Sequence, residues 1–155
     1  MIEIRHIGID EYNGAYQLMH ENMVLYHDMY SLRWDQGWIE ENYRDKDNYS
    51  IFWCGKWIGF LSLEWESDKL TIHTLQLSKV AQGNIYGHRV FEWILDLAET
   101  KGIVEIACRS FKDNPTVSLY KKLGFEVVSA KGFLLELRVS FNKARQSRRL
   151  RRRCA

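Results

Sequence analysis

The sequence predicts a single mixed α+β domain, and three observations lead to this fold class. Residues 49–77 read as three consecutive strands joined by tight turns. Amphipathic helical segments alternate with further strand-like segments on both sides of these strands. The chain has 155 residues and one proline, Pro115, so it is long enough to bury a core and shows little sign of a linker between domains.

The segment before these strands is predicted to contain one strand and two helices. Residues 2–7 (IEIRHI) alternate as a strand does, and Asp10 follows as a plausible helix N-cap. Apolar residues at helical spacing predict a helix over about residues 11–30. Asp35 is expected to cap a second, short helix, and residues 45–48 (DKDN) indicate a polar turn.

Three strands in meander order are expected next. They are predicted at residues 49–54, 57–66 and 70–77, with turns at residues 55–56 and 67–69. In the third strand Leu70, Ile72, Thr74 and Gln76 share one face, because successive side chains of a strand point to opposite faces.

The C-terminal half is predicted to hold two helices and three strands. These are expected, in order, as a helix over residues 86–101, a strand over 103–108, a helix over 115–123, and strands over 125–130 and 132–139 joined around Lys131. Gly102 and Gly124 stand where the two helices should end. Asn114 can cap the second helix, and Pro115 fits its first position.

Charge is divided unevenly along the chain. The net charge is +2, but residues 142–155 hold seven basic residues and no acidic one, which leaves 15 basic against 20 acidic residues in 1–141. An acidic body argues against a nucleic-acid-binding surface over the whole chain. We therefore predict a folded domain over 1–141 and a basic, flexible tail over 142–155, which alone could attach to a nucleic acid or another acidic surface.

Other features of the composition narrow the class of protein. No apolar run approaches the roughly 20 residues that span a bilayer, and the N-terminus lacks the pattern of a signal peptide, so we expect a cytoplasmic protein with no membrane partner. Cys54, Cys108 and Cys154 are odd in number and widely spaced, which is typical of reduced thiols. The histidines are scattered, and no metal site is predicted.

The stretch from Gln82 to Gly87 (QGNIYG) lies between a predicted strand and a predicted helix. A helix start leaves backbone N–H groups without partners and carries partial positive charge. Small residues ahead of it let an anion approach; Gly83 and Gly87 supply bare backbone, and Gln82 and Asn84 offer side-chain donors. The stretch is therefore a candidate pyrophosphate site, although an ordinary turn before a helix would show the same pattern.

A second stretch, Asn114–Glu126 (NPTVSLYKKLGFE), gives this loop its context. Together the two stretches resemble the GNAT N-acetyltransferase superfamily, which binds acetyl-CoA. The family's pattern Q/R-x-x-G-x-G/A falls on residues 82–87, and its later Asn, "LY" and "GF" fall on Asn114, Leu119, Tyr120, Gly124 and Phe125. The resemblance covers about residues 2–139. It implies a mostly antiparallel, twisted sheet, flanked by helices, that splays to admit the cofactor.

The resemblance implies acetyl-CoA as the cosubstrate. The strand before the loop should pair its backbone with the pantetheine arm, the loop and helix start should hold the pyrophosphate, and Asn114 should contact the pantetheine or order the following turn. The residues expected at the cofactor are Leu75, Gln76, Leu77, Gln82, Gly83, Asn84, Ile85, Tyr86, Gly87, His88, Asn114 and Tyr120. Ile85 stands where the family usually has glycine. In a helical conformation the N–H of Ile85 can still donate to a phosphate, so we expect the isoleucine to lower the affinity for the cofactor more than to prevent binding.

Acetyl transfer to an amine needs a neutral amine and an acid for the departing thiolate. By the resemblance Tyr120 is expected to be the general acid, because a phenol near the sulfur can protonate the thiolate. Two candidates for the general base remain open: Glu64, acting through water, and His73, whose imidazole titrates near neutral pH. His27 and Asp28 are further groups that could face the substrate.

The acceptor pocket of this fold lies between the first helices and the meander. Residues 26–43 of this region are dense in Tyr, Trp, Asp and Glu, and aromatic faces with carboxylates suit a cationic amine. The residues expected to bind the acceptor are Tyr26, Asp28, Tyr30 and Trp34. The alternative is that the aromatic residues form core and the acids a solvated face.

The predicted function is transfer of an acetyl group from acetyl-CoA to the amine of a small molecule, a metabolite or a drug, by direct attack in a ternary complex. A ping-pong route through cysteine is disfavoured, since nothing places Cys54 or Cys108 beside a base. Acetylation of a protein amine, a non-catalytic acyl-CoA-binding or sensing domain, and a nucleic-acid-associated protein that works through its tail remain alternatives. The aromatic-rich surface would allow a homodimer.

Overall fold

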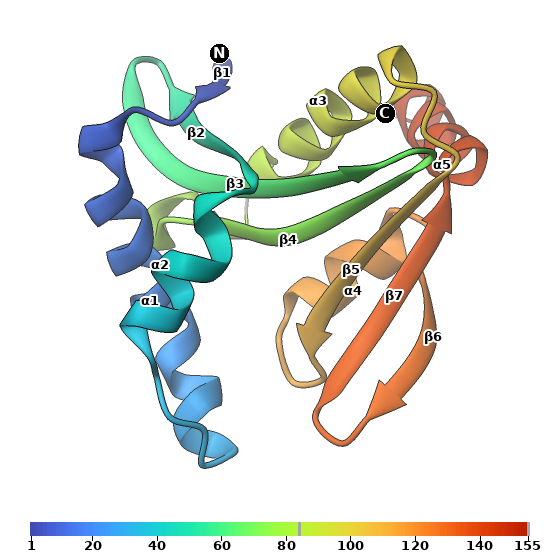
Figure 1. The fold of residues 1–155 in the computed structure, drawn as a ribbon. Coiled ribbons are helices and arrows are strands. Elements are labelled where there is room, and N and C mark those ends of the chain that lie inside the picture. The colour runs from blue at the N-terminus through green and yellow to red at the C-terminus, as the bar shows by residue number, and fades with distance from the viewer. Residues whose placement is uncertain (84, 155) are drawn as a thin grey trace. The chain divides into compact units, whose positions relative to one another are not determined.

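A computed structural model describes residues 1–83 and 85–154, with side chains up to residue 147. Asn84, which we predicted at the cofactor, lies outside the described residues. Within them one sheet has seven strands in the order β1-β2-β3-β4-β5-β7-β6 (Figure 1). The elements are β1 (Ile2–His6), η1 (Ile9–Glu11), α1 (Tyr12–Met29), α2 (Gln36–Arg44), β2 (Asp47–Trp53), β3 (Lys56–Glu66), β4 (Lys69–Leu77), η2 (Lys79–Ala81), α3 (Tyr86–Thr100), β5 (Glu105–Phe111), α4 (Thr116–Lys122), β6 (Glu126–Lys131), β7 (Leu134–Ser140) and α5 (Phe141–Cys154).

The chain divides into two compact units. The first comprises Met1–Glu64 and His73–Gly87, and the second comprises Trp65–Ile72 and His88–Ala155. Antiparallel pairing joins β1 to β2 and β2 to β3 in the first unit, and β5 to β7 and β7 to β6 in the second. β4 pairs in parallel with β5 over Lys69–Ile72, which makes the sheet mixed and confirms the predicted α+β class.

Helices α1 and α2 build the core of the first unit. Their inward side chains pack with Phe60 of β3, and the buried cluster is Ala15, Tyr16, Met19, Ile39, Tyr43 and Phe60. Asp35 caps α2 as predicted, since its Oδ1 accepts a hydrogen bond from the backbone N–H of Trp38 at 3.0 Å.

The predicted cap at Asp10 is wrong. The chain enters α1 through the short 3-10 turn η1, whose N-cap is Gly8. Glu11 Oε1 accepts the N–H of Gly8 at 2.7 Å, the carboxylate bond of a capping box across η1, and the N-cap position of α1 falls to Glu11 instead of Asp10.

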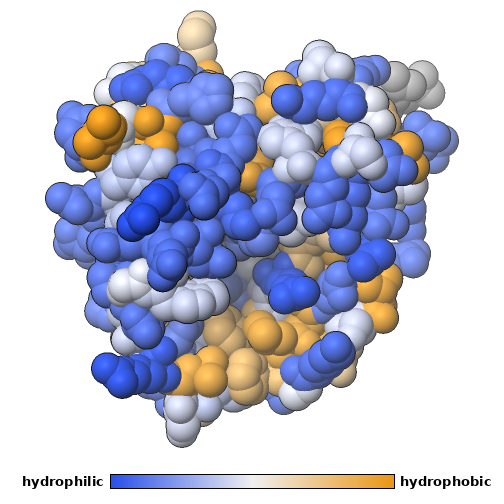
Figure 2. Space-filling view, in the orientation of Figure 1, coloured by the Kyte–Doolittle hydropathy of each residue, from blue (hydrophilic) through white to orange (hydrophobic). Residues whose placement is uncertain are grey.

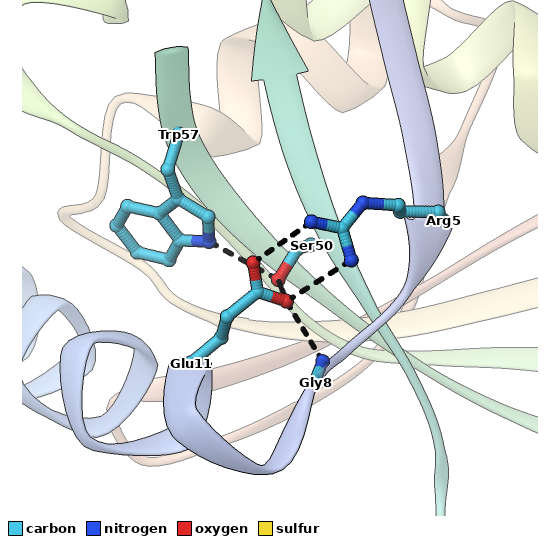
Figure 3. A network of polar contacts seen from close by, with 5 residues as sticks. All are labelled: Arg5, Gly8, Glu11, Ser50 and Trp57. Carbon is cyan, nitrogen blue, oxygen red and sulfur yellow. Dashed lines mark hydrogen bonds and ion pairs between the residues drawn. The ribbon is translucent and has the colours of Figure 1, made fainter. Parts of the chain in front are cut away.

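Glu11 is the centre of a polar network that joins three strands to this turn (Figure 3). Its carboxylate faces the guanidinium of Arg5 on β1 at 3.2 Å and accepts the hydroxyl of Ser50 on β2 at 3.1 Å. The indole N–H of Trp57 on β3 donates to the same hydroxyl at 3.1 Å. The network fixes where the chain leaves β1 for α1.

The predicted polar turn at residues 45–48 is only partly present, because β2 already begins at Asp47. Asn48 is buried, with 4% of its surface exposed. Its amide donates to the carbonyl of Tyr43 at 2.8 Å, and its Oδ1 accepts the hydroxyl of Ser62 at 2.6 Å. A polar residue that reads as a turn is thus a fully bonded part of the core.

The second unit packs α3 and α4 around strands β5 to β7. The side chains of α3 that are almost fully buried are Val90, Phe91, Ile94, Leu95 and Ala98, as its predicted apolar stripe requires. Gly102 and Gly124 end α3 and α4 with φ of 67° and 102°, both in the left-handed region. β5 starts two residues later than predicted and extends to Phe111, because Arg109–Phe111 pair with β7.

The stretch for which we expected a flexible tail starts as a helix packed on the second unit. In α5 Ala144 is fully buried, and Arg145 forms ion pairs with Asp96 and Glu99 of α3 at 2.6 and 3.0 Å. The basic C-terminal segment thus forms ion pairs with acidic residues of α3, and the composition of the segment alone does not predict these pairs.

Hydrophilic residues predominate on the face drawn in Figure 2, and apolar residues gather toward its lower edge. Strands β6 and β7 also carry large apolar residues at the surface. Val127, Val128 and Leu134 are the large exposed apolar residues of these two strands. No helix in the described part of the chain is long and apolar enough to cross a membrane.

Candidate active site

The loop after β4 opens directly onto the start of α3. Gly83 has φ of 75°, in the left-handed region, and a Cβ placed there would meet no atom within 4 Å. Helix α3 begins at Tyr86, and its first turn has no acidic residue but includes His88 and Arg89. Gly87 is buried in that turn. Accessible backbone, unpaired helical N–H groups and local positive charge together suit an anion.

Gln82 holds the loop rather than offering donors to a ligand. Its Nε2 donates to the carbonyl of Leu77 at 2.8 Å and to Oδ1 of Asn22 at 3.2 Å, which uses both N–H bonds of the carboxamide. Its backbone N–H bonds to the carbonyls of Ser78 and Lys79. We predicted Gln82 as a donor to phosphate; in this conformation its donors are already engaged.

The end of β4 is bonded to α1 in the same way. Gln76 and Thr74 are buried as the predicted alternation requires, and Gln76 Nε2 donates to Thr74 Oγ1 at 2.8 Å. Asn22 of α1 donates to Gln76 Oε1 at 3.0 Å and to the carbonyl of Leu77 at 3.1 Å. The carbonyl of Leu77, which we predicted at the cofactor, thus accepts two side-chain N–H groups.

Of the remaining loop residues, Ile85 is 55% exposed. Tyr86 packs its ring edge-on against Trp53 of β2, with centroids 5.0 Å apart. The ring of Tyr86 is therefore in contact with β2.

Glu64 and His73, the two candidates for the general base, lie together. His73 Nε2 is 3.4 Å from Glu64 Oε1, and Lys46 Nζ contacts the other carboxylate oxygen. The hydrogen bond from Lys46 lowers the pKa of Glu64, and His73 adds to this effect. Tyr43 stands edge-on to the imidazole at 6.4 Å. The arrangement is a Lys–Glu–His row in which the carboxylate is held as an anion.

Tyr120, the predicted general acid, belongs to the second unit. It is 6% exposed, and its ring packs edge-on against Phe125 with centroids 5.1 Å apart. Burial raises the pKa of its phenol well above the ordinary value, and the nearby thiol of Cys108 raises it further. Tyr120 therefore keeps its proton throughout the physiological range.

Asn114 orders the turn between β5 and α4, one of its two predicted roles. Its Oδ1 accepts the N–H of Thr116 at 3.0 Å, and its carbonyl accepts the N–H of Val117 at 3.0 Å.

A hollow of about 330 Å³ lies in the first unit against α1. It is lined by Asn13, Tyr16, Gln17, His20, Trp34 and Gln36. The indole of Trp34 stands edge-on to His20 and His27, with centroids 4.9 and 5.1 Å away, and donates to Gln36 Oε1 at 3.1 Å.

Of the four residues predicted to bind the amine acceptor, Trp34 lines this hollow. Tyr26 and Asp28 are in the last turns of α1 and Tyr30 is its C-cap, away from the first turns that form the lining. Three carboxamides, the rings of Tyr16 and Trp34 and the imidazole of His20 line the hollow, in place of the expected carboxylates.

Sequence reasoning missed Asn22 and Lys46. Asparagine is a poor residue for a helix interior, so its place within α1 was a signal for a specific bond. Lys46 lies in a charged turn, where nothing local distinguishes an ion pair with a residue 18 positions away from solvation.

Solved structures with a similar fold include three that are named N-acetyltransferases. The PaiA N-acetyltransferase of Thermoplasma acidophilum, in complex with coenzyme A, is 20% identical, with 90% of this chain and 99% of that chain covered and a TM-score of 0.74. The ribosomal-protein-S18-alanine N-acetyltransferase of Escherichia coli is 16% identical, with coverage of 91% and 94% and a TM-score of 0.72. Spermidine N-acetyltransferase of Vibrio cholerae, with CoA and spermine, is 14% identical, with coverage of 92% and 97% and a TM-score of 0.70.

Residues 13–125, well over half of the chain, match the acetyltransferase (GNAT) family. The chain therefore belongs to this family, as its two motifs predicted, and acetyl-CoA is its cosubstrate. No curated protein sequence matches the chain.

Proposed function

We propose that the protein transfers the acetyl group of acetyl-CoA to the amine of a small molecule by direct attack in a ternary complex. The observation that supports this most is the loop after β4. Gly83 leaves open space beside the backbone, and α3 then begins with a first turn that includes His88 and Arg89. We assign the pyrophosphate of the cosubstrate to the backbone N–H groups of this loop and helix start.

The chemistry that we assign uses two side chains. An amine reaches the site as an ammonium ion and loses a proton to the base, and its nitrogen then forms a bond to the thioester carbonyl carbon. As the C–S bond breaks, the nitrogen loses its second proton to solvent and Tyr120 gives its proton to the leaving thiolate, after which the phenol is reprotonated from solvent. The high pKa that burial gives Tyr120 supports this assignment, because the phenol is present as the acid at neutral pH.

We assign the base to His73, with Glu64 as the group that orients it. The contact with Lys46 supports this choice over Glu64 itself, since the lowered pKa of Glu64 makes its carboxylate a weak base. An imidazole next to a carboxylate accepts a proton readily near neutral pH. Glu64 acting through water is the second candidate.

For the acceptor we propose a small amine with further polar groups. The hollow beside Trp34 supports this: its carboxamides can bond hydroxyl or amide groups, and its aromatic rings can cover a carbon skeleton. The neighbouring folds include an enzyme named for spermidine and one named for a protein alanine, so acetylation of a protein amine is the alternative.

The proposal is tested by measuring thiol release from acetyl-CoA with a panel of polyamines, amino sugars, amino acids and peptides with free N-termini. We expect saturable release with at least one small amine and a product that carries one added acetyl group. Binding of acetyl-CoA with no turnover on any amine would favour the sensing domain, and turnover on peptides alone would favour the protein substrate.

A further inference from the structure

Asn22 joins α1 to both parts of the expected cofactor site. Its carboxamide donates to Gln76 Oε1 and to the carbonyl of Leu77, and accepts from Gln82 Nε2 at 3.2 Å. These partners are 54, 55 and 60 residues further along the chain. Both donors and the acceptor of one helical side chain are thus committed to the end of β4 and to the loop that follows it.

The bonds form a continuous row rather than isolated pairs. From Asn22 the row runs through Gln76 to the hydroxyl of Thr74, both of which are buried. On the other side Gln82 and Asn22 share the carbonyl of Leu77 as acceptor. The row runs from buried Thr74 and Gln76 to Gln82 at the surface, and turning any one of its amides leaves others without their partners.

The row fixes Gln82, and Gln82 is the residue immediately before Gly83. Gly83 is in the left-handed region and has open space around it, so its own packing does not hold it in place. The position of the loop backbone therefore depends on the side-chain bonds of Gln82 to Asn22 and Leu77.

We propose that Asn22 is a positioning residue for the cosubstrate: acting through Gln82, it holds the loop after β4 in the arrangement that binds the pyrophosphate of acetyl-CoA. This inference rests on the proposed cofactor loop. Helix α1 was otherwise expected to bind the amine substrate. The inference makes one of its residues necessary for tight binding of acetyl-CoA as well.

The test is calorimetric binding of CoA to the whole protein and to Asn22→Leu, together with steady-state kinetics. Asn22→Leu removes three hydrogen bonds while keeping the volume of the side chain. We expect the Kd of CoA and the KM of acetyl-CoA to rise about tenfold, because a tenfold change corresponds to the net contribution of one to two hydrogen bonds. We expect kcat at saturating acetyl-CoA to stay within about threefold.

The matched control is Glu21→Gln, the neighbouring position of α1, which is exposed and bonds to Gln17 on the same helix. It should leave the Kd of CoA unchanged. Should Asn22→Leu fail to fold, Asn22→Ala, which removes the same three hydrogen bonds with a smaller side chain, carries the same expectation.

A double-variant cycle separates positioning from general structural damage. If Asn22 acts through Gln82, then Gln82→Leu raises the Kd of CoA similarly, and the double variant is little worse than either single one. Fully additive losses, or an unchanged Kd in Asn22→Leu, overturn the inference. Wild-type protein that does not bind CoA would instead refute the proposed cofactor loop itself.

Discussion

At the scale of single residues, the phenol of Tyr120 is the group to which we assign the role of general acid. Burial raises its pKa, so the phenol keeps its proton at neutral pH. Cys108 lies close to it, but burial raises the pKa of that thiol as well, and so it is no nucleophile at neutral pH.

Tyr120→Phe should lower kcat about 100-fold or more, the usual effect of losing a general acid. The ring and its contact with Phe125 remain, so the unfolding midpoint and the Kd of CoA should change little. The measurement is turnover at saturating substrates together with thermal unfolding. A kcat within a few-fold of wild type would remove Tyr120 from the reaction.

The row of Lys46, Glu64 and His73 makes the pH dependence of the rate a second test. If His73 is the base, kcat/KM falls at low pH as the imidazole becomes protonated, and His73→Gln abolishes that limb. Glu64→Gln removes an anion 3.4 Å from Nε2, which destabilises the imidazolium, so the limb should move to lower pH. Loss of the limb in Glu64→Gln with its retention in His73→Gln would assign the base to Glu64 instead.

At the scale of elements, the sequence predicted those features that depend on neighbours along the chain. The cap at Asp35, the alternation along β4, the apolar stripe of α3 and the glycines that end α3 and α4 all follow from local geometry. Errors arose where a partner distant in sequence decides the structure. Asn48 reads as a turn residue but is bonded to Ser62, 14 residues further along the chain.

The candidate site divides in the same way. The loop and Tyr120 were found by motif, whereas the engagement of Gln82 and the contact of Lys46 with Glu64 require α1 and the turn before β2 to be placed in space. A sequence shows that a glutamine can donate two hydrogen bonds, but not that both are already used.

The network around Glu11 predicts a stability effect at the junction of β1, η1 and β2. Glu11→Ala leaves the N–H of Gly8 and the hydroxyl of Ser50 without that acceptor, and should reduce the free energy of unfolding by about 1–3 kcal/mol. Urea unfolding measures it. Glu3→Ala, an exposed glutamate on β1, should change stability by less than about 0.5 kcal/mol, and equal effects of the two would contradict the network.

At the scale of the whole molecule, charge and burial decide how the fold responds to its surroundings. The body is acidic and α5 is basic, and Arg145 ties the start of α5 to α3. The homodimer and the attachment of the C-terminal segment to an acidic surface stay predictions.

Alkaline pH should destabilise the fold through its buried phenols. Burial raises the pKa of Tyr43 to about 12, from 10.0. Between these values the unfolded chain has lost a proton that the folded chain still binds, so the stabilisation is complete below pH 10 and is lost as the pH rises toward 12. For Tyr43 alone this amounts to at most about 2–3 kcal/mol.

The check is urea unfolding at pH 8 and pH 11.5. Tyr43→Phe loses the hydrogen bond to Thr74 at both pH values, but its further loss of stability between them should be smaller than that of wild type. An equal loss in the two proteins would assign the alkaline transition to other groups.

The central claim is that the acetyl group is transferred directly from acetyl-CoA to the nitrogen of an amine, with no acetyl-enzyme intermediate. The most direct measurement is mass spectrometry of a single-turnover reaction with isotopically labelled acetyl-CoA and the best amine of the panel. We predict that the label appears on the amine, that intact protein carries none, and that Tyr120→Phe slows the transfer. Label on the protein before the amine, or bound cosubstrate with label on neither, would contradict the account.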